Sequence, residues 1–191
     1  MKLDFMKVFL ICITFSAFVL ATAYFSFSQT RQPLPPMENP RIVIMKRKRR
    51  LQIFDGEKLV RQYKIALGFA ARGDKEIEGD GRTPEGEFYI FTKNDQSRFY
   101  LSLGLSYPNS EAAKRGLKEK IISQEEHNAI IKAIEEKQMP PQKTALGGEI
   151  YIHGGSAAEN DWTEGCVALR NEQMKELFDV IPIGAEVKIT S

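Results

Sequence analysis

Residues 151–169 read YIHGGSAAENDWTEGCVAL, and the fold and function assignments both depend on this stretch. It opens inside a short apolar strand, predicted over Glu149–His153, that runs directly into two glycines. Its second half places Gly165 immediately before Cys166, and a glycine at that point permits a tight backbone bend that exposes the sulfur. The pattern therefore predicts an accessible histidine at a strand end and a cysteine on a bend.

Short strands separated by turn residues dominate the rest of the chain. The other predicted strands are 41–46, 50–54, 58–67, 87–92, 98–103 and 186–190. Helices are predicted from a cap at Ser110 to about Leu117, from a capping box at Ser123 to about Lys137, and after a cap at Asn171. This count predicts a mainly β domain with two or three inserted helices.

The N-terminal residues have a different composition. Lys2 and Lys7 precede an apolar run, Val8–Phe27, that is 20 residues long and could cross a hydrocarbon core as a helix. Ala21-Thr22-Ala23 also has the small-x-small form of a cleavage site. Residues 1–27 are therefore either a signal anchor or a signal peptide. An N-terminal membrane helix would hold the protein at the membrane.

Two further segments follow along the chain. Residues 28–40 contain four prolines and are predicted to form a semi-extended linker. Residues 41–191 are predicted to form the folded, exported domain. Within it, Lys46 to Arg50 are five consecutive basic residues. We interpret them as a solvated hairpin tip, with contact to an anionic polymer or a lipid headgroup as the alternative.

Charge and cysteine content narrow the functional class. A formal net charge of +2 does not indicate a nucleic-acid-binding protein. Of the two cysteines, Cys12 lies in the apolar run, so Cys166 has no disulfide partner in the exported domain. A lone thiol in an oxidising compartment needs a reason, and catalysis is one. One cysteine and two histidines fall short of a structural zinc site, so we predict no metal and no cofactor.

Cys166 and His153 together suggest nucleophilic catalysis. The thiolate of Cys166 would attack, and the imidazole of His153 would act as general base. Ser156, Asp161 and a backbone carbonyl are the candidates for the group that orients the imidazole. The other histidine, His127, falls on the polar face of a predicted helix and is not expected to take part.

These residues resemble a known family. Ile152-His153-Gly154 followed by Thr163-Glu164-Gly165-Cys166-Val167 resembles the YkuD-type L,D-transpeptidase catalytic domain, whose signature is His-Gly and then Ser/Thr-x-Gly-Cys. Thr83-Pro84-Glu85-Gly86 is similar to the family's Thr-Pro-x-Gly. The resemblance covers about residues 41–190. It implies a β-sandwich-like or barrel-like catalytic fold.

The resemblance also implies an activity. Family members act on peptidoglycan stem peptides in the cell envelope through a cysteine thioester. The acyl group of this thioester is then transferred to an amine. The product is a 3→3 cross-link or an attached envelope lipoprotein. Carried over to this chain, Cys166 is the nucleophile and His153 the base, on the extracytoplasmic (periplasmic) face of the membrane. The resemblance also leads us to expect acylation of Cys166 by carbapenems.

The remaining site candidates are Gly154, Thr163, Gly165 and Arg170, for binding the oxyanion or the substrate. Many family members carry Arg or Asn at the second position after the cysteine, where this chain has Ala168. Arg170 is either a contact for a substrate carboxylate or a surface residue. Two other functions stay open. One is a hydrolase that uses the same Cys–His pair, and the other is a non-catalytic wall-binding module.

Overall fold

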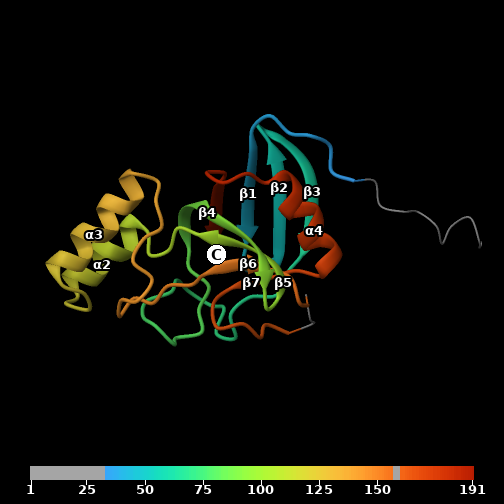
Figure 1. Ribbon diagram of the computed structural model, residues 1–191. Helices are drawn as coiled ribbons and strands as arrows, with labels where there is room; N and C mark the ends of the chain where they lie inside the picture. The colour runs from blue at the N-terminus through green and yellow to red at the C-terminus, as the bar shows by residue number, and fades with distance from the viewer. Residues whose placement is uncertain (1–32, 157–159) are drawn as a thin grey trace, which may run out of the picture. The chain divides into compact units, whose positions relative to one another are not determined.

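Strands form most of the folded part of the protein. The computed structural model describes residues 33–156 and 160–191. Within these ranges the strands are β1 (Pro40–Met45), β2 (Arg50–Asp55), β3 (Lys58–Lys64), β4 (Gly86–Ser97), β5 (Tyr100–Leu105), β6 (Tyr151–His153), β7 (Val167–Ala168) and β8 (Glu186–Thr190). The helices are α2 (Ser110–Lys118), α3 (Gln124–Glu135) and α4 (Asn171–Val180). The prediction of a mainly β domain with helices is confirmed (Figure 1).

The eight described strands form one curled sheet in the order β3-β2-β1-β8-β4-β5-β6-β7. The pairs β1–β8 and β6–β7 are parallel, and the other neighbours are antiparallel. Strand β4 pairs with β8 over Gly86–Tyr89 and then with β5 from Ile90 onward. Its register shifts between Ile90 and Thr92, and such an irregularity bends a strand. β4 therefore joins two halves of the sheet that face different directions.

The two edges of the sheet meet beyond β3. Ala66 forms an antiparallel bridge with Ala168 of β7, and Gly68 forms a parallel bridge with Thr163. The Ala66 and Ala168 amides exchange hydrogen bonds of 3.0 and 2.9 Å. These bridges close the curl toward a barrel. Cys166 lies between Thr163 and Ala168, the two bridged residues on this side of the seam.

The core lies inside the curl and under α4. Alternate residues of β1, β2 and β8 point inward, as strand geometry requires. The buried set is Ile42, Ile44, Leu51, Ile53, Val187 and Ile189. Met174 and Leu177 bury the inner face of α4, and the Tyr63 hydroxyl of β3 donates a 2.6 Å hydrogen bond to Glu176. Helices α2 and α3 pack on each other at the opposite side of the domain (Figure 1).

The helix starts differ in part from the prediction. Ser123 caps α3 with the predicted capping box, so that start is confirmed. The cap of α2 is Asn109 rather than Ser110, because the Asn109 side chain accepts from the Ala112 amide at 2.9 Å. The predicted cap at Asn171 is wrong, since Asn171 is the first residue of α4 and its Oδ1 accepts from the Gly155 amide at 2.7 Å.

Arg47 and Lys48 are exposed, but the rest of the basic turn is not the solvated tip that its composition predicts. Lys46 is 2% exposed, and its ammonium donates to the carbonyls of Gly73 and Thr83 and to the Glu85 carboxylate. Arg49 pairs with Asp161. The partners lie 27 to 112 residues away, so the local charge pattern could not reveal them.

The predicted N-terminal helix lies outside the described residues. Among residues 33–156 and 160–191, no helix is both long enough and apolar enough to cross a membrane. The described end of the proline-rich segment contacts the domain. Leu34 is buried in the core, and the amides of Glu38 and Asn39 donate to the Asp55 carboxylate at 3.1 and 2.8 Å.

Candidate active site

The loop before Cys166 is held by backbone hydrogen bonds to the chain that leaves β3. The Thr163 amide donates to the Leu67 carbonyl at 3.1 Å, and the Thr163 carbonyl accepts from Phe69 at 2.8 Å. These bonds fix the loop at the seam of the sheet. The cysteine thus stands on a rigid strand end rather than on a free loop, which favours precise positioning of a reactive group.

Thr163 also holds the cysteine through its side chain. Its hydroxyl accepts from the Gly165 amide at 3.2 Å and donates to the Cys166 carbonyl at 2.7 Å. Gly165 has a φ of +133°, and a Cβ there would lie 2.8 Å from the Arg82 carbonyl oxygen. Both the dihedral and the close approach require glycine. The predicted bend before the cysteine is therefore present, and a buried threonine stabilises it.

The sulfur of Cys166 is half-buried and contacts the segment that leads into β6. The Tyr151 amide points at Sγ at 3.4 Å, and the thiol lies 3.5 Å from the Glu149 carbonyl that can accept from it. Glu149 has a φ of +53°, and its own amide donates to Gln142 Oε1 at 2.7 Å. Two backbone groups of one short segment therefore define the position of the sulfur.

The environment of the sulfur disfavours its ionised form. Burial raises the pKa of the Cys166 thiol to about 11, and the nearby carboxylates of Glu149 and Glu164 act in the same direction. The hydrogen bond from the Tyr151 amide opposes them, because it favours the anion and lowers the pKa. The cysteine is therefore a neutral thiol near pH 7. It needs a base before it can attack an electrophile.

His153 and Cys166 lie on the same face of the sheet. In the parallel pair β6–β7, Ile152 is opposite Val167 and His153 is opposite Ala168. Ile152 and Val167 both point into the core and are fully buried. Because successive side chains alternate, His153 and Cys166 both point to the other face, with Cα atoms roughly 8 Å apart by strand spacing and rise.

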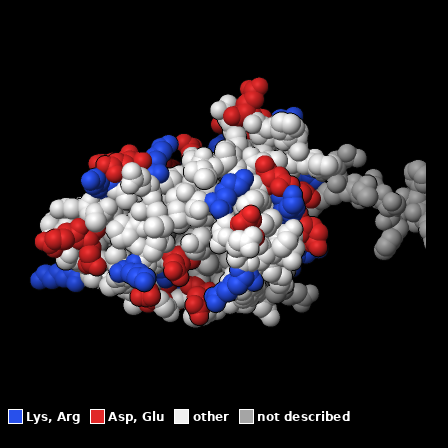
Figure 2. All heavy atoms as spheres, viewed as in Figure 1, with Lys and Arg blue, Asp and Glu red and all other residues white. Residues whose placement is uncertain are grey.

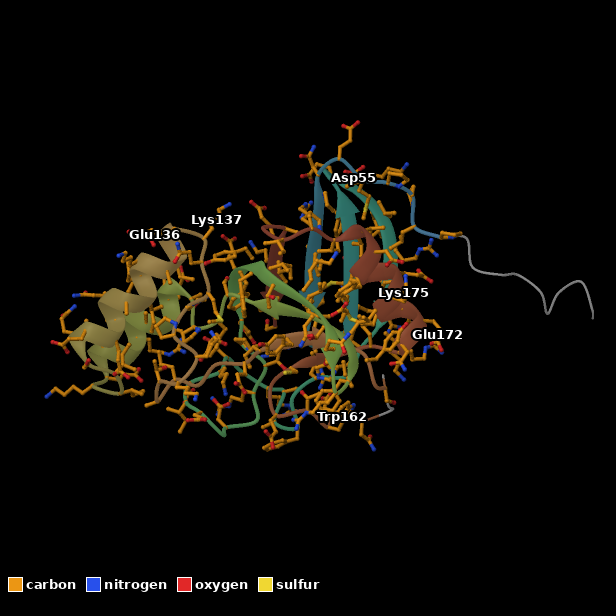
Figure 3. All side chains as sticks on the ribbon, in the orientation of Figure 1. Asp55, Glu136, Lys137, Trp162, Glu172 and Lys175 are labelled. Carbon is orange, nitrogen blue, oxygen red and sulfur yellow. The ribbon has the colours of Figure 1, made fainter. Side chains whose placement is uncertain are left out.

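The prediction of an accessible histidine is wrong, because His153 is only 3% exposed and aromatic rings enclose its imidazole. The Phe99 ring stacks on it at a centroid distance of 4.5 Å, and the Trp162 ring meets it edge-on at 5.8 Å. The Trp162 indole N–H donates to the Ser156 carbonyl at 3.2 Å. In Figure 3, Trp162 lies at the lower edge of the domain. These rings exclude water from the faces of the imidazole and restrict its rotation.

A backbone carbonyl orients the imidazole. His153 Nδ1 lies 2.6 Å from the Gly154 carbonyl oxygen, which can only accept, so Nδ1 carries a proton. The pKa of His153 is lowered, chiefly because burial disfavours the imidazolium. A neutral ring protonated at Nδ1 leaves Nε2 with a lone pair, and such a nitrogen can accept a proton. Of the other two candidates for this role, Asp161 pairs instead with Arg49.

The remaining predicted residues differ in their surroundings. Gly154 is buried, and a Cβ on it would lie 2.7 Å from Asn171 Oδ1, so only glycine fits. The Gly165 amide, predicted to face an oxyanion, donates instead to Thr163. No described group accepts from the Cys166 amide. Arg170 is exposed at the start of α4 and pairs with no described residue.

Sequence reasoning missed several neighbours of the two central residues. Glu149 and Tyr151 contact the sulfur, and Phe99 and Trp162 contact the imidazole. Glu149 and Tyr151 reach the sulfur through backbone groups, and no side-chain pattern predicts such contacts. No local pattern pointed to Phe99, which reaches the site through the turn between β4 and β5.

The second histidine of the described residues lies apart from this group. His127 lies on α3, where its ring contacts only the side chains of Gln124 and Asn128. The described residues contain no cluster of three or more His, Cys, Asp or Glu side chains that could bind a metal ion. The chemistry available at this place is that of a thiol, a neutral imidazole and backbone amides.

Comparison with known proteins identifies the family. The model of the YkuD L,D-transpeptidase catalytic domain matches residues 39–189. The chain therefore belongs to the YkuD family of L,D-transpeptidase catalytic domains. No curated protein matches the chain.

Solved structures with a similar fold include two bacterial proteins. Bd1075 from Bdellovibrio bacteriovorus is 22% identical, covers 83% of this chain and 51% of its own, and has a TM-score of 0.51. The helical cell shape determining protein Pgp2 from Campylobacter jejuni is 22% identical, with coverages of 87% and 53% and a TM-score of 0.53. At this identity the likeness concerns the fold. The chain spans about half the length of these two proteins.

Proposed function

We propose that this protein is an L,D-transpeptidase that acts on peptidoglycan stem peptides, with Cys166 as nucleophile and His153 as general base. The observation that carries the proposal is the common face of β6 and β7, from which the thiol and the neutral imidazole both project. Membership of the YkuD family supports the reaction class. The steps assigned to Cys166 and His153 follow from the chemistry of a thiol and a neutral imidazole.

The first half of the proposed reaction forms a thioester. Nε2 of His153 takes the thiol proton as Cys166 Sγ attacks the carbonyl carbon after the L-centre of diaminopimelate in a tetrapeptide stem. The Cys166 amide, which has no described acceptor, is suited to stabilise the oxyanion of the tetrahedral intermediate. The C–N bond then breaks, and the departing D-alanine amine takes the proton from the imidazolium. The acyl group remains on the sulfur, and the imidazole is neutral again.

The second half transfers the acyl group to an amine. The acceptor attacks the thioester carbon, His153 removes a proton from the amine nitrogen, and the thiolate leaves and recovers that proton. Glu149 and Glu164 support an amine acceptor, because both carboxylates are exposed, unpaired among the described residues and close enough to raise the pKa of the thiol. Two negative charges beside the thioester attract the cationic form of an amine such as that of diaminopimelate or lysine, which gives one proton to water before the neutral amine attacks.

A muropeptide assay tests the proposal. The 191-residue chain, kept soluble in a mild detergent, is incubated with disaccharide-tetrapeptides and the products are identified by mass spectrometry. We expect 3→3 cross-linked dimers, and none with Cys166→Ala. Tripeptides without dimers would assign the same Cys–His pair to hydrolysis instead. Unchanged substrate, or equal products from the Cys166→Ala variant, would overturn the proposal and favour a wall-binding module.

The proposal also includes the location of the domain. Residues 1–27 would anchor or export the chain, residues 28–40 would link the membrane to the domain, and residues 41–191 would work on the extracytoplasmic side. A protease added to intact cells or spheroplasts should then digest the domain. Full protection that is lost only when the inner membrane is lysed would contradict this location.

A further inference from the structure

A pocket lies beside the basic turn. Its volume is about 950 Å³, which is enough for a group much larger than a single ion. The charged residues that line it are Lys46, Arg47, Arg49, Arg72, Glu85 and Asp161. Basic and acidic side chains are interspersed on the face of the domain seen in Figure 2. The lining of this pocket therefore contains four basic and two acidic side chains.

The inner charges of the pocket are already neutralised. Lys46 pairs with Glu85 at 3.1 Å, and Arg49 binds both carboxylate oxygens of Asp161, with its Nε 3.0 Å from each. Lys46 is almost completely buried, and such a cation is retained only with partners. These two ion pairs form a rigid floor and leave no net charge for a ligand.

The two remaining cations are unpaired. Arg47 and Arg72 come from different segments of the chain, are exposed, and form no ion pair or side-chain hydrogen bond with any residue the structure describes. Ser191 also borders the pocket and pairs with neither arginine. A guanidinium group matches the geometry of a carboxylate or phosphate, which it binds through two parallel N–H donors.

The position of the pocket connects it with the catalytic loop. The Asp161 carboxylate that pairs with Arg49 also accepts from the Leu67 amide at 2.9 Å, and the next residue, Trp162, packs on His153. Asp55 and Trp162 mark opposite ends of the domain in Figure 3. The chain enters the sheet beside Asp55, because Pro40 pairs with it. The pocket therefore lies at the active-site end of the domain, away from the end where the chain enters.

We propose that this pocket binds a carboxylate-bearing part of a peptidoglycan stem peptide, with Arg47 and Arg72 as the residues that contact the carboxylate. The identity of the polymer rests on the proposed function. The binding of a carboxylate at this place is inferred from the two unpaired arginines, the size of the pocket and its position beside the catalytic loop. A phospholipid headgroup fits less well, because β1 separates the pocket from the end of the domain that the N-terminal segment joins.

Binding of a muropeptide to a non-reacting protein tests this proposal. The background is the full chain with Cys166→Ala, so that the disaccharide-tetrapeptide is bound but not converted, and affinity is measured by calorimetry. Adding Arg47→Gln and Arg72→Gln should weaken binding at least about tenfold, since it removes two bidentate charged contacts. The matched control, Lys114→Gln with Lys118→Gln, removes the same charge from α2 and should leave the affinity unchanged.

Three results would overturn the proposal. The first is equal affinity in the background and the double arginine variant. The second is equal affinity for a muropeptide whose carboxyl groups are amidated. The third is tighter, Arg47-dependent binding of glycerol 3-phosphate, a soluble headgroup mimic, which would assign the pocket to phosphate.

Acylation and muropeptide binding together distinguish a wrong assignment of the pocket from a wrong assignment of the enzyme activity. Acylation of Cys166 by a carbapenem, measured in the double arginine variant with its cysteine intact, reports on the thiol alone. Normal acylation with unaltered muropeptide affinity rejects only the pocket. Absent acylation in the unaltered chain, with Arg47-dependent muropeptide binding, rejects only the enzyme.

Discussion

The Cys166–His153 site and the basic turn Lys46–Arg50 lie at the same end of the sheet but are stabilised in opposite ways. At the site, backbone groups hold two neutral side chains, and burial keeps both neutral. At the turn, carboxylates and carbonyls hold charged side chains in place. The two side chains of the site carry no formal charge, whereas removing one partner of a buried ion pair leaves an uncompensated charge. We therefore expect substitutions at the site to affect mainly chemistry, and substitutions at the turn to affect mainly stability.

The largest effect should come from His153→Gln. Loss of the general base should lower the rate of Cys166 acylation by about 10²- to 10⁴-fold, with a much smaller change in the free energy of unfolding. The rate is measured by mass spectrometry against time, with His127→Gln as the matched control that should acylate normally. A rate within threefold of the unaltered chain would mean that the base is misassigned.

Lys46→Met should show the reverse pattern. It keeps the apolar stem but leaves the Glu85 carboxylate and two carbonyls without their donor, so the free energy of unfolding should fall by about 3 kcal/mol. Urea denaturation measures this, and the exposed neighbour variant Lys48→Met should change it by less than about 0.5 kcal/mol. Equal small effects from both variants would show that the Lys46 ion pair contributes nothing to stability.

Thr163→Val tests the boundary between the two regions. Removing the hydroxyl leaves the Gly165 amide unsatisfied, which should cost about 1–2 kcal/mol of stability and slow acylation about tenfold through a misplaced sulfur. Thr163→Ser keeps the hydroxyl and should restore both quantities. Loss of stability with an unchanged acylation rate would separate this threonine from the positioning of the cysteine.

We expect His153, rather than the basic turn, to determine how the free energy of unfolding changes at acidic pH. Because burial lowers the pKa of His153 in the folded protein, the unfolded chain protonates first as pH falls below its ordinary value near 6.5. The free energy of unfolding should therefore decrease from that pH down to the lowered folded pKa. Urea midpoints measured across this range should fall less steeply in His153→Gln and just as steeply in Lys46→Met. Identical slopes in all three proteins would show that the imidazole is not held neutral.

Sequence alone predicted the parts of the fold that local pattern determines. Strands β2 and β8 and the capping box at Ser123 follow from alternation and from a three-residue spacing, so they were found. Strand β7 was missed, because two residues carry no periodicity and only their tertiary pairing with β6 and Ala66 makes them a strand. In the candidate site, too, local pattern predicted some residues and tertiary contacts determined the others. Glycines mark His153 and Cys166 locally, whereas Phe99 and Glu149 approach them through tertiary contacts.

Acylation of the thiol tests the central claim most directly. The full chain is treated with a carbapenem, and the modified residue is located by peptide mapping. We expect a single adduct on Cys166 that forms quickly in the unaltered chain, slowly in His153→Gln and not at all in Cys166→Ala. An unmodified Cys166, or an adduct that forms equally fast without His153, would contradict a thiol activated by that imidazole.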